Sequence, residues 1–136
     1  MQTLYTAQAA TTGGRDGRVS SKDGQLEFDV RIPKEMGGAG GATNPEQLFA
    51  AGYSACFDSA LNLVARGQGV DLKGSVVDAE VSIGKEGEAY KLAVKLTVTM
   101  PGVEKEVAQK LVEAAHQVCP YSNATRGNVE VELVVA

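Results

Sequence analysis

Polar and apolar residues follow a period of two along several stretches of the chain, which predicts β-strands. The strands are expected near residues 26–32, 75–83, 92–100 and 129–135, and Pro33 ends the first of them. The third has the clearest apolar face, formed by Leu92, Val94, Leu96, Val98 and Met100. Residues 84–89 are rich in glycine and charge and predict a hairpin between the second and third strands.

A long apolar stretch after residue 43 predicts a helix. Asn44 suits the N-cap, Pro45 the first helical position and Glu46 the positive end of the helix dipole. The helix is expected to end near Arg66, before Gly67. Apolar side chains lie on almost every side of it, which predicts burial on most sides. Because a chain of 136 residues has few elements to cover such a helix, a partner subunit is its expected cover.

A second helix is predicted over Val103–Val118, where apolar residues recur at helical spacing. Cys119 is expected to end it, because the residue before a proline leaves the helical region. The order of elements is therefore strands, helix, strand pair, helix and strand. This order predicts a single α+β domain that spans residues 1–136.

Composition and charge exclude several classes of function. The net charge is −4, which leaves no basic footprint for nucleic acid or for acidic membrane lipids. The first residues do not resemble a signal peptide, and no apolar run approaches the length of a membrane-spanning helix, so a cytoplasmic protein is expected. With two cysteines, one histidine and no CxxC motif, the chain is a poor candidate for a metal site or for thioredoxin-type chemistry.

Cys56 in the middle of the long helix has two interpretations. Burial raises the pKa of a thiol, so Cys56 is either an inert core residue or a nucleophile that a positive charge activates. Arg15, in the glycine-rich loop 13–17, is the candidate for that charge, or else only a solvated loop residue. An arginine about 4 Å from a thiolate gains on the order of 4 kcal/mol, but burying an ion costs a similar amount. Arg15 therefore needs an anchor.

Glu46 is the candidate anchor, or else only a residue that favours the helix dipole. Ten residues separate Glu46 from Cys56, which corresponds to about 15 Å along a helix. The two side chains cannot share a compact site within one straight helix. If Glu46 holds Arg15 beside Cys56, we expect it to come from the other subunit of a dimer.

Cys119 at the predicted helix end is expected to be mobile and partly exposed. It is either a hydrophobic cap or a resolving thiol, which attacks an oxidised Cys56. His116, one turn earlier, is interpreted as a surface residue of the helix, since nothing nearby in the sequence orients it.

Three segments resemble a known family. They are TNPEQLFAAGYSACF at residues 43–57, VCPYSNATRGN at 118–128 and GGRDGR at 13–18. These segments are similar to the signatures of the organic hydroperoxide resistance (Ohr) branch of the Ohr/OsmC superfamily. The resemblance implies an α+β fold with antiparallel sheets, a long buried central helix and a second helix. It also implies an intertwined homodimer with sites at the subunit interface.

The resemblance further implies the activity and the roles of the site residues. The family reduces organic hydroperoxides, including lipid-derived ones, to alcohols, as part of the response to oxidative stress. Cys56 corresponds to the peroxidatic cysteine and Cys119 to the resolving one, with which it forms a disulfide. Arg15 and Glu46 correspond to the pair that activates the thiolate. Dihydrolipoamide or a lipoylated protein supplies the electrons, and no metal or bound cofactor takes part.

Some features are compatible with more than one role. Phe49, Tyr53 and Phe57 are apolar neighbours suited to a greasy substrate, or are core residues. The run Gly37–Gly41 is a gate or a plain loop. Three other functions also remain open: an OsmC-type peroxidase with broader peroxide use, a redox sensor that reacts once, and a structural protein with inert thiols.

Overall fold

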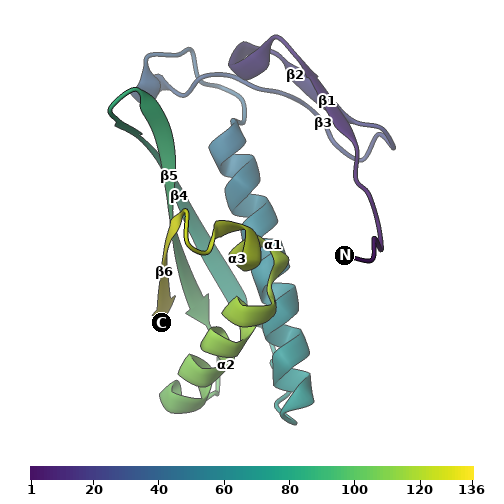
Figure 1. Cartoon of the computed structure of the whole chain (residues 1–136), viewed down its shortest axis with the longest axis vertical. Coiled ribbons are helices and arrows are strands. Elements are labelled where there is room, and N and C mark those ends of the chain that lie inside the picture. The colour runs from purple at the N-terminus through teal and green to yellow at the C-terminus, as the bar shows by residue number, and fades with distance from the viewer. The chain divides into compact units, whose positions relative to one another are not determined.

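The computed structural model describes residues 1–136, which form two compact units (Figure 1). The first unit comprises Met1–Leu48 and the second comprises Phe49–Ala136. Each unit contains one three-stranded sheet. The α+β class is thus confirmed, whereas the prediction of one domain over residues 1–136 stays a prediction.

The first unit is built on an antiparallel sheet. Strands β1 (Ala9–Thr12), β2 (Arg18–Ser21) and β3 (Glu27–Asp29) pair in that order. The strand predicted over residues 26–32 is therefore shorter, because beyond Asp29 only an isolated bridge between Val30 and Thr43 continues the pairing. The short, polar strands β1 and β2 carry no clear alternation of apolar residues, so their sequence does not reveal them.

Helix α1 spans Pro45–Gly67, as predicted. Asn44 is its N-cap, since Asn44 Oδ1 accepts the backbone N–H of Gln47 at 2.9 Å. Within the chain the helix buries one face only, at Tyr53, Phe57, Ala60, Leu61 and Ala65. The chain by itself does not cover the other sides of the helix, so their burial by a partner subunit stays a prediction.

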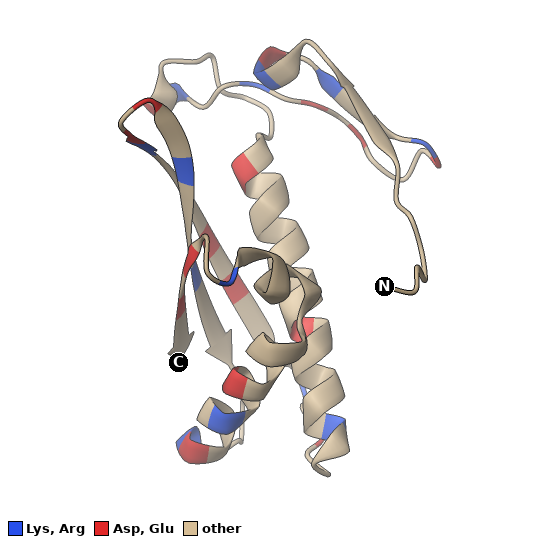
Figure 2. Ribbon diagram, in the orientation of Figure 1, with Lys and Arg blue, Asp and Glu red and all other residues tan.

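The remaining surface of α1 is open and mostly apolar, with Gln47 and Ser59 among its exposed polar residues. Leu63 is 59% exposed, and only Glu46, Asp58 and Arg66 bring charge to the helix (Figure 2). By length and composition α1 is able to cross a membrane, a property that core helices of soluble proteins share. This corrects the expectation that no apolar run approaches that length.

The second unit contains a mixed sheet. Strand β4 (Val76–Glu86) pairs antiparallel with β5 (Ala89–Thr99), and β6 (Glu130–Val135) pairs parallel with β5. The prediction of antiparallel sheets is thus wrong for this one, because a helical crossover returns the chain to β5 in the same direction. The hairpin turn is also tighter than predicted, since pairing continues to Glu86 and Ala89.

Two further helices complete the second unit. Helix α2 spans Lys105–Val118, and a short helix α3, which the sequence did not predict, spans Pro120–Thr125. Pro120 at its first position suits a helix start, but six residues rich in polar side chains show no apolar period. Residues of α1, β5 and α2 form the centre of the core: Tyr53, Phe57, Leu61, Val94, Leu96, Val98, Leu111, Val112 and Ala115.

Candidate active site

Two free thiols meet in the second unit. Cys56 lies on α1, and Cys119 joins α2 to α3. The thiol of Cys119 donates to Cys56 Sγ across 3.7 Å. The fold therefore brings together the two cysteines that the sequence selected as partners, and no disulfide joins them in this structure.

The exposure of the two cysteines is the reverse of the expectation. Cys119 is completely buried, whereas Cys56 retains some exposed surface. The prediction that Cys119 is partly exposed is wrong, because α3 follows directly on α2 and the junction packs into the core. Of the two thiols, the one in the middle of the long helix is the one that a solute reaches first.

The surroundings of Cys56 within its unit do not favour the thiolate. Burial raises the pKa of Cys56, and the neighbouring Cys119 raises it further. The backbone N–H of Tyr121 acts in the opposite direction and partly offsets the effect of burial on that pKa. Cys56 therefore needs an additional positive group to become a strong nucleophile near neutral pH.

Arg15 and Glu46 form a two-pronged ion pair in the first unit. The Arg15 guanidinium donates from its two terminal nitrogens to Glu46 Oε2 at 2.9 Å and to Glu46 Oε1 at 2.6 Å. The Glu46 side chain is only 12% exposed. The hydrogen bond from Arg15 lowers the pKa of Glu46, and the same bond raises the pKa of Arg15, so the pair stays ionised.

The loop that carries Arg15 has the tight geometry expected of its glycines. Residues Gly14–Asp16 form a single 3₁₀ turn, and Gly13 and Gly14 adopt φ values of 77° and 57°. Such positive φ values are strained for any other residue. Arg15 pairs with the Glu46 of its own chain, so one subunit by itself assembles the ion pair. The expectation that Glu46 and the Cys56 it serves come from different subunits stays a prediction.

The three predicted pocket residues differ in exposure. Tyr53 and Phe57 are fully buried and belong to the core, whereas Phe49 is only partly buried. Tyr121, which the sequence did not single out, packs edge-on against Phe49 and is tilted against Tyr53, with ring centroids 6.1 and 5.7 Å away. Of the predicted pocket, Phe49 is thus the residue with surface available to a substrate.

His116 is not the free surface residue that was expected. It is half-buried, and its Nδ1 lies 2.8 Å from the Ser122 hydroxyl. Burial, followed by the charge of Arg126, lowers the pKa of His116. The sequence missed this contact because α3, which carries Ser122, was not predicted.

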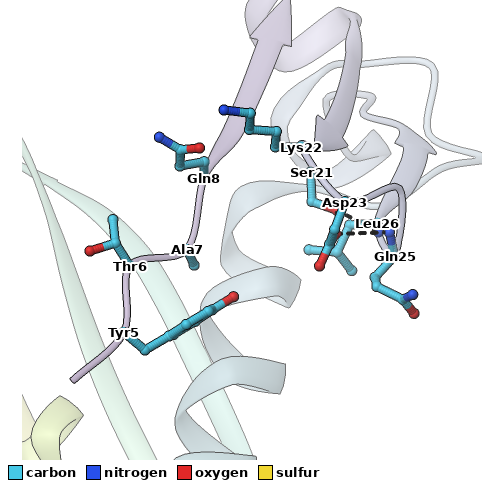
Figure 3. Close-up of a pocket in the computed structure, with 9 residues that line it drawn as sticks. All are labelled: Tyr5, Thr6, Ala7, Gln8, Ser21, Lys22, Asp23, Gln25 and Leu26. Atoms are coloured by element: carbon cyan, nitrogen blue, oxygen red, sulfur yellow. Dashed lines mark hydrogen bonds between the residues drawn. The ribbon is translucent and has the colours of Figure 1, made fainter.

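An open pocket of about 490 Å³ lies in the first unit, between the N-terminal segment and the β2–β3 turn (Figure 3). Its lining includes Tyr5, Lys22 and Asp23 but none of the predicted site residues. The Asp23 carboxylate is already satisfied within the turn, by the Ser21 hydroxyl and the backbone N–H of Gln25. We assign no chemistry to this pocket.

The structure thus belongs to the class of small α+β proteins in which two free thiols lie in contact. The family model described as OsmC-like protein matches residues 38–134. The organic hydroperoxide resistance protein of Xanthomonas axonopodis pv. citri is 52% identical over 98% of this chain and 95% of its own length. The chain belongs to the OsmC-like family, within its organic hydroperoxide resistance branch.

Solved structures agree with this assignment. The organic hydroperoxide resistance protein of Elizabethkingia anophelis is 57% identical, with a TM-score of 0.95 over 100% of this chain and 99% of that one. OhrB of Bacillus subtilis is 45% identical, with a TM-score of 0.91 over 98% and 100% of the two chains. The fold and the family are therefore shared with proteins of organic hydroperoxide resistance.

Proposed function

We propose that this protein is a thiol peroxidase that reduces organic hydroperoxides to alcohols in the cytoplasm. The observation that carries the proposal is the 3.7 Å contact between Cys119 Sγ and Cys56 Sγ. The relatives' role in organic hydroperoxide resistance supports the substrate class. The partial exposure of Cys56, against the complete burial of Cys119, supports Cys56 as the sulfur that meets the peroxide.

The reaction has two steps at sulfur. The Cys56 thiolate attacks the distal oxygen of the peroxide, the O–O bond breaks, and the alkoxide leaves as the alcohol after taking up a proton. The sulfenic acid on Cys56 then reacts with the Cys119 thiol, and water leaves as the S–S bond forms. For this second step the sulfurs approach from 3.7 Å to the roughly 2.05 Å of a disulfide bond.

Arg15 supplies the positive charge that the thiolate needs in this mechanism. Burial raises the pKa of Cys56, and its own unit offers only the Tyr121 N–H in compensation. Glu46 holds the Arg15 guanidinium by two hydrogen bonds and so orients it. The guanidinium then also stabilises the negative charge that develops on the leaving oxygen.

A homodimer completes the site in this proposal. Ten residues of α1 separate Glu46 from Cys56, about 15 Å along the helix, so the ion pair of one subunit serves the Cys56 of the other. The open apolar side of α1, which includes Leu63, supplies a surface for the second copy. We expect Leu63→Glu to weaken self-association in sedimentation experiments, with the exposed Tyr90→Phe as the unaffected control.

An apolar hydroperoxide suits the half-buried Phe49, and a dithiol regenerates the enzyme. Attack of the dithiol on the Cys56–Cys119 disulfide returns both cysteines to thiols and leaves the donor oxidised. We propose a dihydrolipoyl group, free or on a lipoylated protein, as this donor. No metal or prosthetic group has a part in the mechanism.

The test is steady-state reduction of cumene hydroperoxide with dihydrolipoamide as the reductant. We expect continuous turnover. When the reductant is exhausted, we expect mass spectrometry to detect a Cys56–Cys119 disulfide. If the unmodified protein consumes only one equivalent of peroxide while reductant is in excess, the proposal is contradicted and the protein is a redox sensor. No reaction of either thiol indicates a structural role for both.

A further inference from the structure

A chain of hydrogen bonds, buried except at His116, joins α1, α2 and α3, the helices that carry or flank the two cysteines. The Tyr53 hydroxyl of α1 lies 2.8 Å from Ser122 Oγ and 3.2 Å from Thr125 Oγ1, both of α3. Ser122 Oγ also lies 2.8 Å from Nδ1 of His116 on α2, and the Thr125 hydroxyl donates to the Ser122 carbonyl at 3.1 Å. Together Tyr53, Ser122, Thr125 and His116 form a hydroxyl network.

Counting the protons gives this network a direction. It has four contacts, and its three hydroxyls carry one proton each. The Thr125 hydroxyl donates its one proton to the Ser122 carbonyl, so in its contact with Tyr53 it can only accept, and Tyr53 donates. The Tyr53 proton is then used, so Ser122 donates in the contact between Ser122 and Tyr53. The contact between Ser122 and His116 is then a hydrogen bond only if Nδ1 of His116 carries a proton and donates it to Ser122. The histidine is therefore an obligatory donor at one end of the network.

The network surrounds the junction that holds Cys119. His116 precedes Cys119 by three residues and Ser122 follows it by three, while Tyr53 precedes Cys56 by three on α1. Residues three apart share one face of a helix, so Tyr53 fixes α3 to the side of α1 that carries Cys56. Arg126, which follows α3, bonds the His116 carbonyl of α2 and also Asn123 Oδ1 of α3, and so links the end of α3 to α2.

We infer that the hydroxyl network positions Cys119 against Cys56 and thereby sets the rate of disulfide formation. This inference rests on the proposed peroxidase function. Its residues act through the placement of α3 and touch neither the peroxide nor the reacting oxygen, so they are positioning residues. Polar groups buried in a core cost free energy unless all are bonded, and none of the buried side-chain polar atoms in the chain lacks a partner.

The position of Cys119 matters because the sulfenic acid has two fates. The Cys119 thiol loses its proton and attacks Cys56 sulfur, so that water leaves and the disulfide forms. Alternatively a second peroxide oxidises the sulfenic acid to a sulfinic acid, which dithiols do not reduce, and an alcohol leaves. The ratio of disulfide to sulfinic acid at Cys56 therefore measures how well Cys119 is positioned, independently of how much protein is folded.

The experiment follows both fates in single turnover. Reduced protein is mixed with excess cumene hydroperoxide and quenched at intervals, and mass spectrometry measures the thiol, disulfide and sulfinic forms of Cys56. For Tyr53→Phe and Ser122→Ala we expect loss of the Cys56 thiol at a rate within about twofold of the unmodified protein. Disulfide formation is expected to slow about tenfold, as for the loss of one buried hydrogen bond, with a matching rise in sulfinic acid.

Two matched controls lie outside the network. Ser54→Ala removes a hydroxyl of α1 that bonds only the carbonyl of Ala51, and Tyr90→Phe removes an exposed phenol on β5. Both are expected to keep the ratio of disulfide to sulfinic acid of the unmodified protein. A change in these controls equal to that in Tyr53→Phe overturns the inference.

The role of His116 as a donor is tested by a pair of substitutions. The amide of His116→Asn can present an N–H near the position of Nδ1, whereas His116→Ala presents none. We expect His116→Ala to lower the ratio of disulfide to sulfinic acid and His116→Asn to restore most of it. Equal ratios for both variants and the unmodified protein overturn the role of His116.

The remaining outcomes separate this inference from the proposed function. If the unmodified protein does not oxidise Cys56 with cumene hydroperoxide, the peroxidase function fails, whatever the variants do. If it does, and the network variants slow thiol loss and disulfide formation equally, the network is only structural and the inference fails. Because His116 is half-buried, its variants still give an answer should Ser122→Ala not fold.

Discussion

The Arg15–Glu46 ion pair and the Cys56–Cys119 thiol pair are built in opposite ways. The ion pair lies on a tight glycine loop and a first helical turn, keeps 36% of the Arg15 side chain exposed and is held by charge. Cys119 lies in the packed core and Cys56 packs against it, and the groups that act on the pKa of Cys56 are the backbone N–H of Tyr121 and the Cys119 thiol. The first region thus holds an ion pair with little packing around it, and the second holds two closely packed thiols.

This difference is the reason why the proposed mechanism draws on both regions. A packed apolar core holds two sulfurs at a defined separation, but the same burial raises the pKa of Cys56. A guanidinium on an exposed loop remains ionised at little cost, but it cannot define a distance between sulfurs. We therefore expect substitutions in the first region to alter the ionisation of Cys56, and substitutions in the second to alter the fate of its sulfenic acid.

The largest effect is expected at the thiols themselves. Cys56→Ser should lower the rate of peroxide reduction about a thousandfold or more, because a serine hydroxyl is not ionised near neutral pH. Cys119→Ser should still form the sulfenic acid with one equivalent of peroxide, and should then stall or be oxidised further to the sulfinic acid. Peroxide consumption under dihydrolipoamide turnover measures both, and full turnover of Cys56→Ser contradicts the assignment.

The next largest effect is expected at Arg15. Arg15→Ala should lower kcat/KM for cumene hydroperoxide about a hundredfold, through loss of the charge that favours the thiolate and the leaving oxygen. Arg15→Lys should recover only part of this loss, because an ammonium cannot make the two-pronged contact with Glu46. The matched control is Arg18→Ala, which breaks an exposed ion pair with Asp29 and should leave kcat/KM unchanged.

Glu46→Gln should have a smaller effect of about tenfold on kcat/KM, because it weakens the hold on Arg15 without removing the guanidinium. The alkylation rate of Cys56 against pH distinguishes this from unfolding, since a poorly held Arg15 should move the thiol titration to higher pH. An unchanged titration together with reduced activity argues against a role for Glu46 in activation.

Acid should weaken the same contact in the unmodified protein. Arg15 holds the pKa of Glu46 below its ordinary value, so the carboxylate contributes stability above that ordinary value, near pH 4.3. This contribution is lost as the pH falls through the lowered pKa of the folded state. Denaturant midpoints between pH 6 and 3 should fall more steeply for the unmodified protein than for Glu46→Gln.

The smallest effect is expected from His116 on stability. Burial lowers its pKa, so between that pKa and the ordinary value near 6.5 the unfolded chain binds a proton that the folded chain does not. Stability is therefore full above about pH 6.5 and declines as the pH falls below it. Denaturant midpoints at pH 7.5 and 5.5 should differ less for His116→Asn than for the unmodified protein.

The sequence by itself determined the features that depend on neighbouring residues. Local spacing of residues determines the N-cap at Asn44, the extent of α1 and the buried face of β5. The conformational freedom of glycine determines the turn around Arg15. The family motifs singled out Cys56 and Cys119, which the fold does bring into contact.

Only the tertiary structure decided the features that depend on segments far apart in the chain. These features are the burial of Cys119, the parallel pairing of β6 with β5, and the contact between Tyr53 and Ser122. Each depends on contacts between residues that no local sequence pattern relates. Helix α3 belongs to the same group, because a six-residue polar segment gains its stability from hydrogen bonds to Tyr53 and His116 rather than from its own helix propensity.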